Sequence, residues 1–448
     1  MGGFDTVLDA CAALLRETAL FAAFGFLLLG LSDLLVDLIW LALRLFRRPG
    51  RVLPMAGRPG RLAIFVPAWD EGAVIGRMLT HAQTVFGEAE YRLYVGCYPN
   101  DPDTIAAVRA AAGPRVRLVI GPAPGPTSKA DCLNRIWERM IEDEAVEDVP
   151  VKAVILHDAE DVVHSAELPL FDAFIETCDL IQLPVLPLVD PQSRFVSGHY
   201  LDEFTEAHGK ELVVRTAIGA SLPSAGVGCA ISREALAALA AARGAPFDPD
   251  SLTEDYELGL SLHALGRRAA FVRLPAGPGR PVVATREYFP ATLDAAVAQK
   301  ARWMTGIALA GWDRLGWSGG LAERWMRLRD RQSLLAALVL AAAYASLILY
   351  VLLLVVAWLA PWTLPPFGPA LTALLAVNSF LLLWRLTVRF GFVAAAYGWR
   401  EGLRSLPRSV TANIIAMMAA RRALARYLAG RTQWDKTAHA FPHQPPAE

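Results

Sequence analysis

Charged residues are scarce in this sequence and unevenly spread. They make up 19% of the 448 residues, against about 25% in soluble domains, and none lies from Gln332 to Trp384. As one helix, that stretch would be about 80 Å long, far beyond a hydrocarbon core of about 30 Å. It must therefore turn back, and the proline-rich segment 361–366 is the predicted turn. We expect two membrane spans, residues 334–359 and 367–389; the alternative is a very apolar pair of core helices in a soluble protein.

A third apolar run, residues 19–43, lies near the N-terminus and contains two carboxylates. Asp33 and Asp37 are four residues apart, so a helix would place them on one face. Because carboxylates are costly inside a membrane, these two either face protein or a wet cavity, or they mark the membrane boundary. A cleaved signal peptide is disfavoured, because the basic cluster follows the apolar run instead of preceding it.

Arginines flank the apolar runs and orient the chain. Four follow the first run and four precede the second: Arg44, Arg47, Arg48 and Arg51, then Arg324, Arg327, Arg329 and Arg331. By the positive-inside rule, residues 44–333 are expected in the cytoplasm and the N-terminus in the periplasm. Nine arginines and one acid, Glu401, lie from Arg385 to Arg431, although the net charge is −1. This basic tail predicts contact with anionic lipids, and we expect no nucleic-acid partner.

Cysteine is also sparse, which limits the possible architectures. The five cysteines have neither C-x-x-C nor metal-ligand spacing, so neither a disulfide framework nor a cysteine metal site is expected. The chain is too long for one ordinary domain. We predict four parts: an N-terminal transmembrane helix (1–50), a cytoplasmic domain (51–330), two transmembrane helices (331–390), and basic interfacial helices with a tail (391–448).

Within the cytoplasmic part, strand-like and helix-like patterns alternate. Short apolar runs predict strands, and the segments between them predict helices: strands at 62–66, 91–97, 115–120 and 151–156, and helices at 72–85, at 105–112 and from near Ser128. This alternation is typical of a doubly wound, mostly parallel α/β sheet. Ligands bind such sheets outside the carboxyl ends of the strands. Polar residues that directly follow a strand are therefore the first candidates for a site.

The first two strand ends carry acids that have either a binding role or a purely structural one. Trp69, Asp70 and Glu71 follow the first strand, where they could bind a base and a ribose, or simply complement a helix dipole. Asp101 and Asp103 follow the second, in a sequence that is also good turn chemistry.

A lysine opens the helix that begins near Ser128. Ser128 and Asp131 form a pattern like a capping box. Lys129 in the first turn is unfavourable to the helix dipole, so it makes more sense facing an anion such as a diphosphate. A solvated lysine is the alternative.

Three acids crowd the end of the fourth strand, and they are the sharpest local signal. Asp158, Glu160 and Asp161 follow an apolar strand. Like charges so close repel unless a cation lies among them. Mg²⁺ or Mn²⁺, held by one or two carboxylates and by substrate phosphate oxygens, suits this pattern. A solvated acidic turn is the alternative.

Two further patterns lie nearer the second apolar run. Glu254 and Asp255 begin a predicted helix capped by Ser251 or Thr253, and Asp255 is either a general base or a first-turn acid. In a predicted helix at 291–305, three residues fall at i, i+3 and i+4 on one face: Gln299, Arg302 and Trp303. Such a face can clamp phosphate or stack on a sugar or base, or it can be an interfacial aromatic belt.

The order and spacing of these motifs resemble the family 2 glycosyltransferases. The motifs are Pro-Ala-Trp-Asp-Glu (67–71), Lys-Ala-x-x-Leu-Asn (129–134), Asp-x-acid (158–160), Thr-Glu-Asp (253–255) and Gln-x-x-Arg-Trp before membrane helices (299–303). The resemblance covers about residues 61–310 and implies an inverting enzyme with a GT-A fold. Residues 157–164 and 434–439 look most like the phage-adsorption-protein-B subgroup, whose members sit in the bacterial inner membrane and are linked to exopolysaccharide formation.

The resemblance also implies roles for the residues, which remain expectations at this point. The implied roles are donor nucleotide contacts at Asp70, Glu71 and Asp101; phosphate contacts at Lys129 and Arg302; metal and diphosphate contacts at Asp158 and Glu160; a catalytic base at Asp255; and acceptor or pyrophosphate contacts at Glu254, Gln299, Arg302 and Trp303. The usual Asp-x-Asp reads Asp-Ala-Glu here, so Glu160 or Asp161 is the second metal ligand. A C-terminal regulatory domain, common in the subgroup, is not expected in this chain.

Taken together, the sequence predicts an enzyme that uses a nucleotide-sugar, most simply a UDP-sugar, with a Mg²⁺ or Mn²⁺ cofactor. The acceptor is a polysaccharide or a lipid-linked molecule, and export partners are expected if a polymer crosses the membrane. Two alternatives stay open: a polyprenyl-phosphate glycosyltransferase that adds one sugar, and a non-catalytic scaffold or phage-adsorption component.

Overall fold

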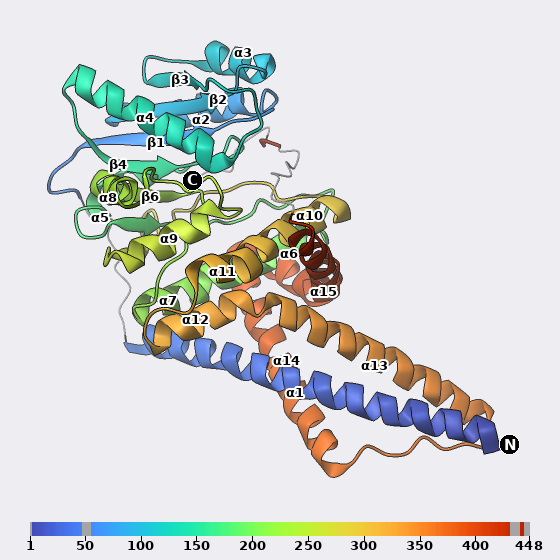
Figure 1. The fold of residues 1–448 in the computed structure, drawn as a ribbon. Coiled ribbons are helices and arrows are strands. Elements are labelled where there is room, and N and C mark those ends of the chain that lie inside the picture. Colours follow the sequence, from blue (N-terminus) through green and yellow to red (C-terminus); the bar gives the residue numbers. More distant parts are fainter. Residues whose placement is uncertain (1, 47–54, 431–439, 443–448) are drawn as a thin grey trace.

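The molecule has an α/β part and a helical part that projects from it (Figure 1). The computed structural model describes residues 2–46, 55–430 and 440–442. Arg47, Arg48, Arg51 and the motif at 434–439 lie outside these ranges. The N-terminus lies at the far end of the projecting helices, whereas residues 440–442 lie against the α/β part.

A seven-stranded sheet organises the α/β part. Its strands are β1 (Arg61–Pro67), β2 (Tyr91–Cys97), β3 (Val116–Ile120), β4 (Val151–Leu156), β5 (Leu180–Gln182), β6 (Cys229–Ser232) and β7 (Ala269–Phe271). They pair in the order β3-β2-β1-β4-β6-β5-β7. β6 runs antiparallel to β4 and β5, and the other pairs are parallel. The prediction of a doubly wound, mostly parallel sheet is confirmed.

Helices cover both faces of this sheet. They are α2 (Ile75–Phe86), α3 (Pro102–Ala111), α4 (Lys129–Glu147), α5 (Glu167–Phe174), α8 (Arg233–Arg243) and α9 (Glu254–Ala264). Alternate residues of β1 enter two different cores: Ile64 packs with α2, whereas Phe65 packs with α4. The Oγ of Ser128 accepts the N–H of Asp131 at 3.1 Å, so the predicted cap of α4 is confirmed.

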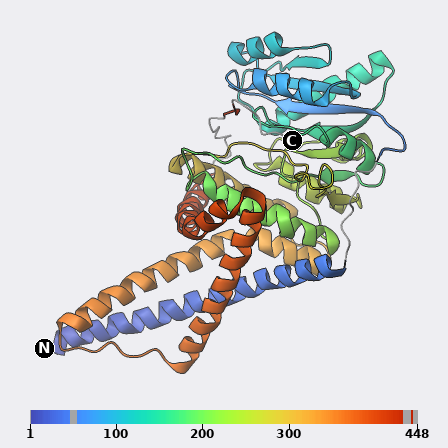
Figure 2. The same cartoon turned by 180° about the vertical axis from the view of Figure 1, so that it is seen from behind.

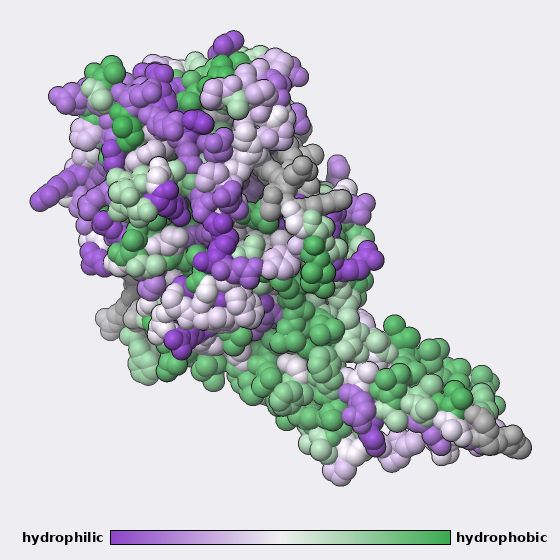
Figure 3. Space-filling view, viewed as in Figure 1, coloured by the Kyte–Doolittle hydropathy of each residue, from purple (hydrophilic) through white to green (hydrophobic). Residues whose placement is uncertain are grey.

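Among the described residues, three helices are long and apolar enough to cross a membrane: α1 (Gly2–Phe46), α13 (Ser333–Leu359) and α14 (Pro369–Tyr397). α1 and α13 run side by side away from the α/β part, and a loop at their far end leads into the returning α14 (Figures 1 and 2). Their surface is largely hydrophobic (Figure 3). α1 starts well before the expected residue 19, and α14 continues beyond the expected residue 389.

The two carboxylates of the first apolar run face protein. Asp37 is buried, where it pairs with Lys210 and accepts the indole N–H of Trp384 at 2.9 Å. Asp33 accepts a hydrogen bond from Arg329 at 3.0 Å and pairs with Arg385. Of the alternatives that the sequence left open, contact with protein is therefore the one observed, and cationic partners offset the cost of burying these charges.

A layer of helices lies between the sheet and the three long helices (Figure 1). It consists of α6 (Gly198–Glu206), the π-helix η1 (Ala207–Glu211), α7 (Leu212–Ala217), α10 (Leu293–Met304), the π-helix η2 (Thr305–Ala310), α11 (Gly311–Leu315), α12 (Leu321–Arg331) and α15 (Trp399–Leu428). α15 is the single helix found in the described part of the tail, where several were expected. It exposes large apolar side chains such as Leu403 and Val410 beside its arginines.

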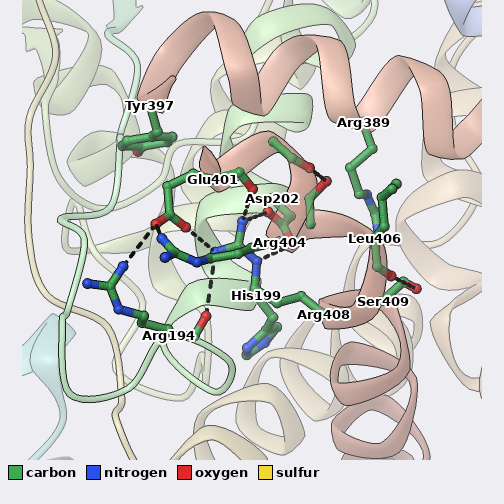
Figure 4. A network of polar contacts seen from close by, with 12 residues as sticks. Arg194, His199, Asp202, Arg389, Tyr397, Glu401, Arg404, Leu406, Arg408 and Ser409 are labelled. Atoms are coloured by element: carbon green, nitrogen blue, oxygen red, sulfur yellow. Dashed lines mark hydrogen bonds and ion pairs between the residues drawn. The ribbon is translucent and has the colours of Figure 1, made fainter. Parts of the chain in front are cut away.

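A buried arginine fixes α15 to α6 (Figure 4). Arg408 is fully buried and donates to both oxygens of Asp202, at 3.0 and 2.6 Å. It also donates to the carboxylate of Glu401 at 2.8 Å. Both carboxylates are buried too, and the guanidinium compensates their charge, together with Arg194 and Arg404 at Glu401.

Replacing Arg408 by methionine should therefore destabilise the protein strongly. Removing one partner of a buried ion pair costs about 3–5 kcal/mol. Here Asp202 loses the guanidinium that binds both its oxygens, whereas Glu401 keeps Arg194 and Arg404. Thermal unfolding in detergent measures the effect. Arg404→Met is the control, because Arg404 pairs with the same Glu401 but is 37% exposed. Equal melting temperatures for the two variants would contradict the account.

Candidate active site

A cavity of about 1000 Å³ lies between the carboxyl ends of the strands and the layer of helices. Ligand sites commonly have about 300–1000 Å³. Loops after β1 and β4 form one side, the starts of α4 and α9 another, and α6, η1, α10 and η2 the floor. The cavity is thus where a doubly wound sheet is expected to bind its ligand.

Asp158, Glu160 and Lys129 meet on the strand side of this cavity. The Nζ of Lys129 lies 2.7 Å from Oδ1 of Asp158 and 3.9 Å from Oε1 of Glu254. Burial lowers the pKa of Lys129, but the carboxylates of Asp158, Glu254 and Asp255 together raise it above its ordinary value. Lys129 is therefore a fixed cation, placed at the N-terminus of α4 where an anion is also favoured.

The donor set of this corner suits a divalent cation. Two carboxylates, Asp158 and Glu160, line the cavity two and four positions after the end of β4. Within the described ranges, no group of three or more His, Cys, Asp or Glu side chains forms a complete metal site. Mg²⁺ and Mn²⁺ accept such a partial set, because phosphate oxygens and water complete the coordination.

Asp161, the alternative second ligand, does not line the cavity. Its fully buried carboxylate accepts the N–H of Asp158 at 3.0 Å and lies 2.8 Å from Nδ1 of His157. The other ring nitrogen of His157 lies 3.1 Å from Glu167. Burial lowers the pKa of His157, but Glu167 and Asp161 raise it to about 10. Asp161 thus supports the backbone beside Asp158, whereas Glu160 lines the cavity, and its role as second metal ligand stays a prediction.

Asp255 lies in the first turn of α9 and lines the cavity. Its Oδ1 accepts the N–H of Tyr256 at 2.7 Å. Burial raises the pKa of Asp255, while Lys129 opposes that shift. Burial, and then Asp255, raise the pKa of Glu254 to about 7. Of the two acids, Asp255 is the one whose carboxylate is held against a glycine.

That glycine, Gly226, makes a sharp test of the position of Asp255. It has φ +75°, and a Cβ there would lie 2.7 Å from Oδ2 of Asp255. Gly226→Ala should push the carboxylate aside and lower turnover by about a hundredfold. Gly219→Ala is the matched control, since Gly219 has φ +72° and nothing within 4 Å. Similar melting temperatures with unequal turnover are expected; equal turnover in the two variants would contradict this placement.

The predicted face of α10 also lines the cavity. Gln299, Arg302 and Trp303 all reach it. Lys300, which lies on another face, pairs with Glu203 of α6. Trp303 contacts the ring of Phe204 with centroids 6.2 Å apart. The interpretation of this helix face as part of the site is therefore favoured over an interfacial aromatic belt.

At the first strand end, the predicted residues divide into two groups. Trp69 and Glu71 line the cavity. Asp70 and Asp101 do not: Oδ2 of Asp101 accepts the N–H of Asp70 at 2.5 Å, and its Oδ1 caps α3 through Thr104 at 3.3 Å. Their contact with a donor nucleotide stays a prediction.

The floor contributes residues that the motifs did not indicate. Glu203, Phe204 and His208 line the cavity from α6 and η1, and Glu287 and Phe289 line it from the segment before α10. Phe204 and His208 lie four residues apart, a spacing that puts them on one helical face, whereas Glu203 is adjacent to Phe204. That shared face is the signal in the sequence that could have indicated Phe204 and His208.

Comparison with known proteins agrees with this geometry. A family model described as "Glycosyltransferase like family 2" matches residues 59–306. Bacteriophage adsorption protein B of Escherichia coli K12 is 37% identical over 98% of this chain and 64% of that protein, so this chain spans less than two thirds of the relative's length. Bacteriophage N4 adsorption protein B of Escherichia coli O157:H7 gives the same values.

A solved structure shares the fold across nearly the whole chain. It is the mannosyltransferase PcManGT of Pyrobaculum calidifontis in complex with GDP-Man and Mn²⁺. The TM-score is 0.55 at 18% identity, and the match covers 93% of this chain and 99% of that one. Since the identity is low, this likeness supports the GT-A fold alone. With the family match, it follows that the chain belongs to the family 2 glycosyltransferases.

Proposed function

We propose that the protein transfers a sugar from a nucleotide-sugar, most simply a UDP-sugar, to a hydroxyl of a saccharide or lipid-linked acceptor, with inversion at the anomeric carbon. The observation that carries the proposal is that Asp158, Glu160, Lys129, Asp255 and Arg302 all line one cavity. Its wall therefore combines groups suited to a diphosphate with a carboxylate able to take a proton.

In the proposed mechanism, each residue has a separate task. Mg²⁺ or Mn²⁺ held by Asp158 and Glu160 would neutralise charge on the diphosphate. Lys129 and Arg302 add fixed positive charge as the diphosphate leaves. Asp255 accepts the proton of the acceptor hydroxyl while that oxygen attacks the anomeric carbon. Trp69 and Glu71 are placed for the nucleoside end, and Gln299 and Trp303 for the acceptor end.

The charge of the cavity wall supports a divalent cation and a neutral acceptor. Among the described lining residues, nine are carboxylates and two are cations: Glu71, Asp158, Glu160, Glu203, Asp250, Glu254, Asp255, Glu287 and Asp330, against Lys129 and Arg302. A donor diphosphate needs more positive charge than this wall supplies, and a second phosphate on the acceptor would meet repulsion. A polyprenyl-phosphate acceptor is therefore the second candidate.

The phage-related names of the relatives suggest a different role, as a scaffold or an adsorption component. The acids at 158, 160 and 255 argue against a degenerate site. If the enzyme transfers sugars repeatedly, we propose that the product is an exopolysaccharide and that export partners carry it out of the cell.

A panel of nucleotide-sugars tests the proposal directly. The full-length protein in detergent is incubated with UDP- and GDP-sugars and Mn²⁺, and nucleotide release is measured. At least one donor should be turned over, and chelation by EDTA should stop the release. If no donor is turned over, or if release is unchanged by EDTA, the proposal is wrong.

We further propose that the protein spans a bacterial inner membrane three times, with the α/β part in the cytoplasm and α15 against anionic lipids. The indole N–H of Trp362 donates to Asp9 at 3.1 Å, which puts the turn after α13 beside the N-terminal part of α1. Reporter fusions after residue 361 should read periplasmic, and fusions after residue 431 cytoplasmic. The reverse pattern would exclude this topology.

A further inference from the structure

His208 is held in one tautomer by the backbone. The N–H of Val185 donates to its Nδ1 at 2.9 Å, so Nδ1 acts as an acceptor and carries no proton. Burial lowers the pKa of His208 to about 3, so the ring is neutral at physiological pH. A neutral imidazole with an unprotonated Nδ1 carries its proton on Nε2, which is therefore a hydrogen-bond donor.

This donor is available to the cavity. His208 lines the cavity wall. In the described part of the chain, no group forms a hydrogen bond with Nε2, and the atom is not among the buried polar atoms that lack a partner. Phe204 packs on the ring at a centroid distance of 5.3 Å, and Phe271 lies edge-on at 5.7 Å. The ring orientation is thus fixed while one polar atom stays accessible.

The backbone that carries His208 is tied to two membrane helices. The next residue, Gly209, accepts the indole N–H of Trp40 of α1 at 3.0 Å, and its Cα faces the ring of Phe392 of α14. Lys210 then pairs with Asp37. His208, Gly209 and Lys210 belong to η1, and π-helical turns often occur at functional sites.

A second anchor holds the preceding helix. α6 is fixed to α15 by the contacts of Arg408 with Asp202 (Figure 4). His208 follows α6 directly. Both ends of the segment that presents His208 are therefore clamped, as expected for a group that must be positioned accurately.

Resting on the proposed function, we propose that the Nε2–H of His208 donates a hydrogen bond to an oxygen of a neutral acceptor sugar and so positions it for attack. The surroundings fit such a ligand: Phe204, Phe289 and Trp303 line the same floor and offer faces for a sugar ring. The reacting hydroxyl gives its proton to Asp255, so His208 bonds a neighbouring oxygen of the acceptor. His208 would thereby select acceptors that carry an oxygen at that position.

Two substitutions separate the two nitrogens of the ring. His208→Asn offers an Oδ1 near the position of Nδ1, which can keep the bond from Val185, but no group reaches as far as Nε2. His208→Gln keeps an N–H donor at the distance of Nε2. His199→Asn is the matched control, because His199 lies in the preceding helix α6 and is buried but does not line the cavity.

The test uses the full-length protein and a defined set of acceptors. Cellobiose, diacetylchitobiose and mannobiose are added to the reaction with the donor that is turned over, and a polyprenyl phosphate is a separate arm. Binding of the same disaccharides is also followed by tryptophan fluorescence without donor, so the test does not depend on turnover. His208→Asn should raise the KM or Kd for a disaccharide about three- to tenfold, the value of one hydrogen bond.

The melting temperature should change little in His208→Asn, and His208→Gln should recover most of the acceptor affinity. Unchanged disaccharide affinity in His208→Asn, an equal loss in His199→Asn, or use of the polyprenyl phosphate alone would overturn the inference. Failure of the proposed function can be told apart from failure of this inference. In the first case the wild-type protein releases no nucleotide from any donor, but the fluorescence titration still measures the effect of His208 on disaccharide binding.

Discussion

Replacing Asp255 by asparagine is expected to lower turnover by at least about a hundredfold while donor affinity stays within a few-fold, because positioned general bases contribute about 10²–10⁴-fold in rate. Asparagine keeps the shape of the side chain and can still accept the N–H of Tyr256, but it cannot take a proton. Burial raises the pKa of Asp255. As the pH is lowered, the base is therefore protonated, and the wild-type rate should fall, at a pH above about 4, the ordinary pKa of a carboxylate. Initial rates and nucleotide titrations measure both.

The neighbouring acid supplies the control. Glu254→Gln should have a milder effect, since Glu254 lies beside Lys129 on the diphosphate side. If Asp255 served only the dipole of α9, its loss would cost about 0.3–1 kcal/mol of stability and little activity. Melting temperature and turnover, measured on both variants, separate these cases. A well-folded Asp255→Asn protein with near-normal transfer would exclude the role of catalytic base.

Asp158→Asn should remove most of the metal-dependent binding of nucleotide without unfolding the protein. The substitution removes charge with little change of shape. Among the described residues that follow β4, only Asp158 and Glu160 bring a carboxylate to this part of the cavity wall. Loss of its charge also leaves Lys129 without its nearest partner. Calorimetry with UDP, with and without Mn²⁺, measures the effect. Unchanged affinity in the presence of Mn²⁺ would contradict the metal assignment.

The two other acids of this turn should respond differently from each other. Glu160→Gln should resemble Asp158→Asn, because Glu160 lines the cavity. Asp161→Asn should mainly lower the melting temperature, because its carboxylate is buried between His157 and the backbone of Asp158. If Asp161→Asn lost Mn²⁺-dependent binding and kept its melting temperature, Asp161 would be the ligand.

The sheet and its site-bearing strand ends could be predicted because their signals are local. An apolar run that ends in acids places those acids at the edge of a parallel sheet, and Glu71, Asp158 and Glu160 lie there. Spacing along a helix likewise predicted that Gln299, Arg302 and Trp303 share a face. These predictions needed only strand ends and helical periodicity, which nearby residues determine.

Contacts between distant segments could not be predicted in the same way. The inward orientation of Asp161 depends on His157 and Glu167, and the engagement of Asp101 depends on how the loop after β1 meets α3. The position of His208 follows from contacts with α1, α14 and α15, far away in the sequence. Likewise, Asp33 and Asp37 pair with cations of η1 and α12, which are far from them in the sequence.

The stereochemistry of the first transfer distinguishes a single displacement from a double displacement. With Asp255 as the only base in a single displacement, attack occurs on the face opposite the departing diphosphate. The reaction of the preferred donor is followed by ¹H NMR from its first minutes, before the product can mutarotate, and the anomeric coupling of the new linkage is read. The account predicts inversion, so that an α-linked donor gives a β-linked product. Retention of configuration would require a different mechanism and would contradict the role assigned to Asp255.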